Sequence, residues 1–201
     1  MNGFKLTDKA YKELLATRTE RAKKSRFVEP RCILGIDPGE NTGMAIIKPN
    51  QKPQVMTKGF WSCFDYVNES YFSQYTVLVI EQGGLNSPLF SSVAERMAEQ
   101  YRRQGRTITQ KDREAFRRAE NKHAMNVGAA NEQAELLIEG FTRRGYYVVT
   151  FRPVAGKKWK THEIAKAHTG IVQQTNDHTR VALQLAWDYR SLLTVTSPIY
   201  Y

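Results

Sequence analysis

The chain has 201 residues, enough for one domain with a substantial core and too few to favour two full-sized domains. Its 30 Lys and Arg residues against 20 Asp and Glu residues give a formal net charge of +10, which predicts a polyanionic partner, with nucleic acid as the first candidate. A basic surface kept only for solubility is the alternative. The N-terminus lacks an apolar signal-peptide region, and no run approaches the roughly twenty apolar residues that span a bilayer. Cys32 and Cys63 form no disulfide or metal pattern, so we expect a cytoplasmic protein that crosses no membrane.

The N-terminal part of the chain is predicted to be an extension separate from the main domain. Residues 7–24 combine good helix formers with a Thr-Asp start and many charges, which is typical of a solvated helix. From Arg31 the pattern changes to short β-rich runs separated by Pro, Gly and Asn. We therefore expect a basic helical extension over 1–30 and a main domain over 31–201, which opens with an antiparallel meander at 31–37, 42–49 and 54–61.

The rest of the main domain alternates predicted helices with predicted strands. Residues 75–82, YTVLVIEQ, are a continuous apolar run, typical of a central strand that crossover helices cover on both faces. The other predicted elements are a helix at 62–73, a long helix at 123–144, a strand at 146–153, a short helix at 161–170 and a final helix at 177–193. This order predicts an α/β fold, a mixed sheet with helices on its faces.

A basic segment is inserted before the long predicted helix. Most of its charge lies between residues 102 and 122, on Arg102, Arg103, Arg106, Lys111, Arg113, Arg117, Arg118 and Lys122. A run of this kind is commonly the solvated face of a helix. Because it follows the strand that ends in Glu81, we predict instead a basic helical insertion at about 84–122 that contacts DNA close to that residue.

Two of the predicted strands end on a carboxylate. Asp37 closes the first strand, in ILGIDPGENTGMAII, and Glu81 closes YTVLVIEQ. A carboxylate at the end of a buried strand is costly to desolvate unless it is paired or binds a cation. If the two strand ends are adjacent, a divalent cation relieves the repulsion between the acids, and oxygen ligands suit Mg²⁺ or Mn²⁺. The alternative for Asp37 is a turn residue, since Asp-Pro-Gly is a common turn sequence.

The hairpin after Asp37 contains glycines at two informative positions. Pro38 and Gly39 turn the chain without placing a side chain over the carboxylate. Gly43 leaves room for a DNA backbone in one interpretation. Glycine is also the ordinary choice in a hairpin, and this is the interpretation that we favour for Gly43.

A third acidic position lies at the start of the final predicted helix. Asp177 and His178 precede apolar residues at helical spacing, so both are expected at the helix N-terminus, within reach of the sheet edge. An acid in the first turn is also favoured by the helix dipole alone. For His178, the alternative to metal ligation is a hydrogen-bonded residue at the edge of the core.

Five motifs follow one another between residues 31 and 190: GIDPGENTGMA, VIEQ, NVGAANEQAELL, RPVAGKKWKTHE and NDHTRVALQLA. In this order and spacing they resemble the RuvC family of Holliday junction resolvases, most closely its bacteriophage and organellar relatives. The resemblance implies an RNase H-like fold. It also implies a Mg²⁺-dependent endonuclease that nicks four-way or other branched DNA junctions, usually as a homodimer.

The resemblance also implies a role for each matching residue. Asp37 matches the first-strand metal ligand, Glu81 the second, and Asp177 an aspartate at the start of the last helix. Two Mg²⁺ ions about 4 Å apart, for which Mn²⁺ can substitute, would then activate a water and stabilise the leaving 3′ oxygen. Lys160, or less directly Lys158, resembles the family's lysine near the scissile phosphate. The predicted DNA contacts are Arg102, Arg103, Arg113, Arg117, Arg118, Lys158 and Lys160.

The chain departs from the family pattern at the last helix. Bacterial members usually carry a second acidic residue three positions after the one that matches Asp177, and here that position is Arg180. We predict His178 as the substitute ligand, because a neighbouring acidic or histidine side chain contributes at this helix end in related sequences. The predicted catalytic set is therefore Asp37, Glu81, Asp177, His178 and Lys160.

Two other functions stay open on the sequence. One is an ATP-using phosphotransferase of the actin and sugar-kinase type, whose first phosphate loop also reads Asp-x-Gly before a Gly hairpin. The net charge and the lack of a second Gly-rich phosphate loop count against it. The other is a non-catalytic junction-binding protein with a decayed site, which Arg180 makes plausible.

Overall fold

The computed structural model describes residues 30–82, 93–151 and 159–193. The predicted helix at 7–24, and Lys158, lie outside these residues. The chain divides into two units, one made of residues 1–82 and 133–201, the other of residues 83–132. The second unit is inserted in the first, and it ends ten residues later than the predicted insertion.

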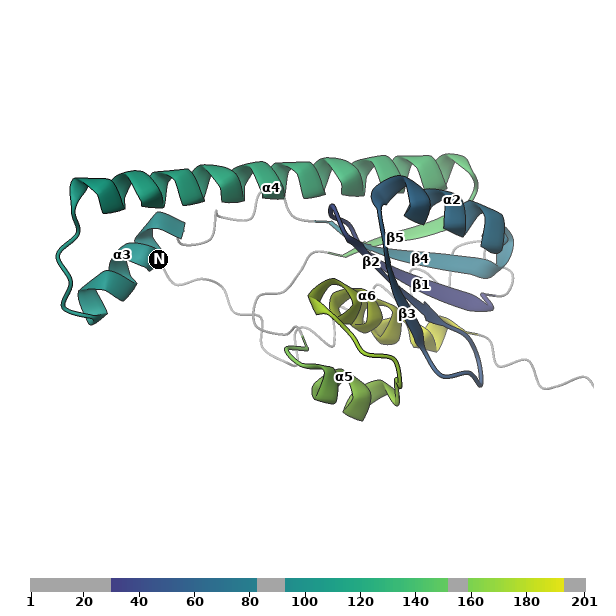
Figure 1. Ribbon diagram of the computed structural model, residues 1–201. Coiled ribbons are helices and arrows are strands. Elements are labelled where there is room, and N and C mark those ends of the chain that lie inside the picture. The colour runs from purple at the N-terminus through teal and green to yellow at the C-terminus, as the bar shows by residue number, and fades with distance from the viewer. Residues whose placement is uncertain (1–29, 83–92, 152–158, 194–201) are drawn as a thin grey trace, which may run out of the picture. The chain divides into compact units, whose positions relative to one another are not determined.

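The first unit contains a five-stranded mixed sheet with strand order β3-β2-β1-β4-β5 (Figure 1). Strands β1 (Cys32–Asp37), β2 (Thr42–Ile47) and β3 (Gln54–Lys58) form the antiparallel meander that the sequence predicts. Strand β4 (Thr76–Glu81) runs parallel to β1, and β5 (Tyr147–Phe151) runs parallel to β4. The carboxyl ends of β1, β4 and β5 therefore meet at one edge of the sheet.

Helices cover both faces of this sheet (Figure 1). Helix α2 (Phe60–Ser70) and residues 133–143 of α4 (Gln110–Arg143) pack on one face. Helix α6 (Asp177–Asp188) packs on the other face, with α5 (His162–Thr169) against it. The predicted α/β class, a mixed sheet flanked by helices, is confirmed. Two short 3-10 helices complete the described part of this unit, η1 (Ser73–Tyr75) and η2 (Arg190–Leu192). No helix in the described ranges is both long enough and apolar enough to cross a membrane.

Helix α4 begins at Gln110, thirteen residues before the start that the sequence predicts. Its first turn is capped by Thr109 and Asp112. The backbone N–H and the hydroxyl of Thr109 donate to Oδ2 of Asp112 at 2.9 and 2.6 Å, and these bonds lower the pKa of Asp112. The Asp112 N–H donates in return to Thr109 Oγ1 at 3.2 Å. A local polar cap therefore marks the start of this helix, and a repeat of apolar residues does not.

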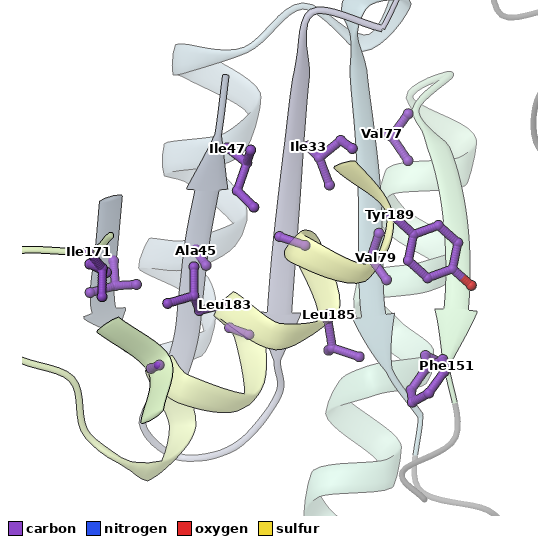
Figure 2. Packing of buried hydrophobic residues seen from close by; sticks show 14 residues of the cluster. Ile33, Ala45, Ile47, Val77, Val79, Phe151, Ile171, Leu183, Leu185 and Tyr189 are labelled. Carbon is purple, nitrogen blue, oxygen red and sulfur yellow. The ribbon is translucent and has the colours of Figure 1, made fainter. Parts of the chain in front are cut away.

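Two buried clusters hold the sheet between its helices. One lies between the sheet and α6 and contains Ile33, Val79 and Leu183 (Figure 2). The other lies between the sheet, α2 and α4 and contains Leu34 and Leu137. Full burial of a side chain of this size contributes about 1.5–3 kcal/mol relative to exposure. Strand β4 is buried along its whole length, as its continuous apolar sequence predicts.

Both cysteine thiols are expected to be unreactive in the folded protein. Cys32 and Cys63 are 5% and 0% exposed, and burial raises the pKa of each thiol to about 12. Because the thiolate is the nucleophile, the raised pKa and the burial of these thiols both slow their reaction at pH 8. A disulfide reagent that releases a coloured thiolate should give almost no signal with native protein and a full signal in guanidinium chloride. A rapid signal from the native protein would contradict the burial of Cys32 in β1 or of Cys63 in α2.

Candidate active site

Asp37 and Glu81 lie side by side at one edge and on one face of the sheet. Strands β1 and β4 are parallel, and the residues directly before the two acids are register partners. Successive side chains of a strand point to opposite faces, so Asp37 shares a face with Ile33, and Glu81 shares a face with Val79. Ile33 and Val79 both belong to the cluster under α6. The two acids therefore lie on the face that α6 covers, adjacent to each other as the metal hypothesis requires.

His178 connects α6 to this pair of acids. Its Nδ1 lies 2.9 Å from Oδ2 of Asp37. An ionised carboxylate only accepts hydrogen bonds, so Nδ1 carries the proton when Asp37 is ionised. This bond raises the pKa of His178, desolvation opposes the rise, and the charges of Asp37, Asp177 and Glu81 add to it.

The contact makes His178 a hydrogen-bonded residue, as the alternative to metal ligation proposes. The His178 side chain is 47% exposed and that of Asp37 is 14% exposed. His178 is therefore half exposed rather than in the core, and its Nδ1 is engaged by Asp37, while ligation of a metal by His178 stays a prediction. In this geometry His178 is the hydrogen-bond partner of a candidate metal ligand.

Two glycines allow α6 to approach the sheet closely. A Cβ atom on Gly35 of β1 would lie 1.9 Å from the carbonyl oxygen of Ala182. A Cβ atom on Gly43 of β2 would lie 2.4 Å from the carbonyl oxygen of His178. The interpretation of Gly43 as an ordinary hairpin glycine is therefore wrong, because its missing side chain makes room for the backbone of the residue that binds Asp37.

The first turn of α6 is fixed by polar side chains. Asn176 and Thr179 form a reciprocal cap, with the Thr179 N–H donating to Asn176 Oδ1 and the Asn176 N–H donating to Thr179 Oγ1, both at 2.9 Å. The Asn176 amide also donates to Thr57 Oγ1 of β3 at 3.0 Å. These bonds tie the N-terminus of α6 to the sheet and so hold His178 over Asp37.

Asp177 has a different environment from its neighbour. It forms an ion pair with Arg180, and its side chain is 91% exposed, whereas that of Arg180 is 11% exposed. The Arg180 guanidinium also donates to the Thr175 carbonyl oxygen at 3.1 Å. The structure thus brings together Asp37, Glu81 and His178, while Asp177 pairs with the residue that departs from the family pattern.

Lys160 is exposed and directly precedes Thr161, the N-cap of α5. The preceding residue is anchored, since the Trp159 N–H donates to Gln184 Oε1 of α6 at 3.0 Å. The Trp159 ring is stacked on His168, with ring centroids 5.2 Å apart. The backbone at Lys160 is therefore held against α6, and the role of Lys160 at a phosphate stays a prediction.

The described part of the inserted unit is a basic helical hairpin. Helix α3 (Val93–Arg103) and the first turns of α4 are joined by a perpendicular contact between the Tyr101 and Phe116 rings, 5.2 Å apart. Arg102 and Arg103 pair with Glu99 of their own helix, each at 3.2 Å. The remaining predicted DNA contacts in this hairpin are exposed and form no ion pair with a described residue: Arg113, Arg117 and Arg118.

The carboxylate pair fits a hard divalent cation. Asp37 and Glu81 offer oxygen ligands from adjacent rigid strands, and Glu81 is only 8% exposed. Carboxylate oxygens suit Mg²⁺ and Mn²⁺, and a cation offsets the repulsion between shielded like charges. In the described part of the chain, no group of three or more Asp, Glu, His or Cys side chains is arranged to hold a metal ion. The donor set is therefore a pair of acids, with His178 bonded to one of them.

A scan against models of known protein families finds no match for this chain, and a search of curated proteins finds no significantly similar sequence.

Proposed function

We propose that this protein is a Mg²⁺-dependent endonuclease of the RuvC type that nicks four-way or other branched DNA junctions. The observation that carries the proposal is the pair of acids at adjacent strand ends, Asp37 and Glu81, faced by His178 from α6. The meander followed by parallel β4 and β5 also agrees with the RNase H-like fold that the motifs imply. The basic composition of the chain supports a nucleic acid substrate.

The proposed chemistry assigns separate tasks to the residues of the site. Asp37 and Glu81 would hold the cation, which when bound activates a water and stabilises the leaving 3′ oxygen. His178 holds Asp37 in one orientation through Nδ1. Strands and a capped helix N-terminus keep these groups in place, which lowers the entropic cost of aligning a phosphate with them. Lys160 is proposed to contact the phosphate that is cleaved.

We propose that the inserted hairpin contacts the phosphate backbone of one DNA arm. Its exposed arginines, among them Arg117 and Arg118, have no acidic partner within the described residues and can pair with phosphates. Arg102 and Arg103 already pair with Glu99. We therefore expect the α4 arginines to contribute more than the α3 arginines.

Replacing Arg117 and Arg118 by Gln should lower the salt dependence of junction binding. Each phosphate contact contributes about 0.9 to the slope of log affinity against log salt on duplex DNA, so the slope should fall by roughly one to two. The matched control is the double change of Arg102 and Arg103 to Gln, which should lower it less. Fluorescence anisotropy of a labelled junction without divalent metal measures both. An equal slope for wild type and the Arg117/Arg118 variant, at equal melting temperature, would identify this helix face as merely solvated.

A homodimer is the second part of the proposal. Every described side chain of α4 from 124 to 129 is exposed, and Met125 is 75% exposed. Around Gly128, an added Cβ would meet no atom within 4 Å. A helix that exposes apolar and small residues on several sides is suited to packing against a second copy of itself. Sedimentation equilibrium of the full chain tests this part.

The products of the reaction test the proposed function. A labelled four-way junction incubated with protein and Mg²⁺ should acquire nicks that DNA ligase seals, because hydrolysis that expels the 3′ oxygen leaves a 3′ hydroxyl and a 5′ phosphate. The pairing of Asp177 with Arg180 favours one other candidate, a junction-binding protein without catalysis. Tight junction binding without nicking would favour that candidate.

A further inference from the structure

We infer that Arg180 withholds Asp177 from the carboxylate pair, so that the site takes one divalent cation instead of two. This inference rests on the proposed function and concerns the cation of the same site. It departs from the two-ion site that the family resemblance implies. Three features support it: the shielded Arg180 side chain, the hydrogen bond to Asp37 and the charge of the site.

Arg180 holds Asp177 in the ion pair because the charge of Arg180 is largely shielded from solvent. The Arg180 side chain is 11% exposed, and its two terminal nitrogens donate to one acceptor each, the Asp177 carboxylate and the Thr175 carbonyl. If Asp177 moved to a cation at Asp37, the guanidinium would lose its hydrogen-bonded counter-ion. It would keep the neutral Thr175 carbonyl and the charge of Glu163 nearby. Leaving a mostly buried charge without its counter-ion is strongly unfavourable. An ion pair adds little stability where it is open to solvent, as it is at Asp177. The cost of leaving the shielded Arg180 charge without its counter-ion therefore determines where Asp177 lies.

Asp37 has one carboxylate oxygen engaged already. Oδ2 accepts the hydrogen bond from His178 Nδ1 at 2.9 Å. Oδ2 keeps a lone pair after accepting this hydrogen bond, but the His178 ring beside it restricts the approach of a second ion to that oxygen. Glu81 is then the other acid that faces the same ion.

The charges of the site also favour one ion. A second cation bound through Asp177 would lie next to the Arg180 guanidinium, which is charged at every accessible pH. Repulsion from that guanidinium opposes a second site at the start of α6.

Binding of Mn²⁺ to the full chain without DNA, followed by electron paramagnetic resonance of the unbound ion, tests the inference. We expect one Mn²⁺ per chain for the wild type. Asp177→Asn should leave the affinity within about twofold, because the amide can still accept from Arg180 and the ion is held elsewhere. Asp37→Asn should weaken binding more than about tenfold, a loss of about 1.4 kcal/mol.

Arg180→Gln gives the inference its direct test. Removing the guanidinium should release Asp177 and raise Mn²⁺ affinity several-fold, and the double change Arg180→Gln with Asp177→Asn should cancel that gain. Arg190→Gln is the matched control, because Arg190 stacks on Trp187 and donates to its carbonyl oxygen at 2.7 Å. Two ions of similar affinity in the wild type, a tenfold loss in Asp177→Asn, or no gain in Arg180→Gln would each overturn the inference.

The outcomes separate this inference from the proposed function. A protein that nicks junctions and binds two Mn²⁺ ions would overturn the inference and leave the function standing. A protein that binds one Mn²⁺ ion with these variant effects and cleaves no DNA would support the inference and overturn the proposed function. Failure of the wild type to bind Mn²⁺ at all would overturn both.

Discussion

Asp37→Asn should abolish junction cleavage and leave junction binding intact or tighter. The change removes a metal-binding charge from the end of β1 and removes no basic contact to DNA. Loss of a preorganised electrostatic group at a reacting phosphate lowers the rate by about 10²–10³-fold or more. Binding should tighten because one negative charge next to the phosphate backbone is lost. Single-turnover cleavage and metal-free binding, measured on the same preparation, separate the two effects.

A matched control for this variant is Asp65→Asn, which removes an exposed acid from α2. It should leave the cleavage rate and the melting temperature unchanged. Asp37 has a side chain that is 14% exposed and bonded to His178, so the melting temperature of its variant must be measured as well. Near wild-type nicking by folded Asp37→Asn would make Asp37 a turn residue and remove the basis of the metal site.

Gly35→Ala should have the largest effect on stability. The new Cβ would lie 1.9 Å from the carbonyl oxygen of Ala182 and 2.8 Å from its carbonyl carbon, and these are backbone atoms that cannot rotate away. Helix α6 must move or the strand must bend. Overpacking typically costs about 1–3 kcal/mol and occasionally more, and a rigid backbone clash belongs at the upper end, so we expect about 3 kcal/mol. Urea unfolding followed by circular dichroism measures this.

Gly128→Ala is the control for the glycine prediction. Its Cβ would meet no atom within 4 Å, and alanine is favoured over glycine in a helix interior by about 1 kcal/mol. At a concentration where the chain is monomeric, so that the proposed dimer contact of α4 does not contribute, this variant should be as stable as the wild type or more so. Equal urea midpoints for Gly35→Ala and the wild type would contradict the close packing of α6 on β1, and with it the placement of His178 over Asp37.

The sequence predicts the sheet and the two central acids because both depend on local patterns. Alternating and continuous apolar runs identify the strands, and a carboxylate directly after such a run identifies Asp37 and Glu81. Their adjacency follows once β1 and β4 are parallel neighbours. The apolar pattern does not predict the start of α4, because the first turns of this helix have few apolar positions. Thr109 and Asp112, which form its cap, are the signal of that start in the sequence.

The features that the sequence does not predict depend on contacts between distant segments. The sequence around Gly43 is the same whether the glycine serves a hairpin turn or the close approach of a helix. Only the packing of α6 distinguishes these two roles. Asp177 and His178 are neighbours, yet one faces Arg180 and the other faces Asp37, because they point from α6 in different directions. The start of α6 at Asp177 agrees with the predicted helix, and the reciprocal cap between Asn176 and Thr179 is a signal of that start in the sequence.

The most direct measurement compares cleavage of a four-way junction with cleavage of a linear duplex of the same arm sequence. Protein is in excess over end-labelled DNA, and Mg²⁺ or EDTA is present. The account predicts nicks near the branch point of the junction, an intact duplex, and no nicks with EDTA or with Asp37→Asn. Equal cleavage of junction and duplex, or the same junction nicks from folded Asp37→Asn as from wild type, would contradict it.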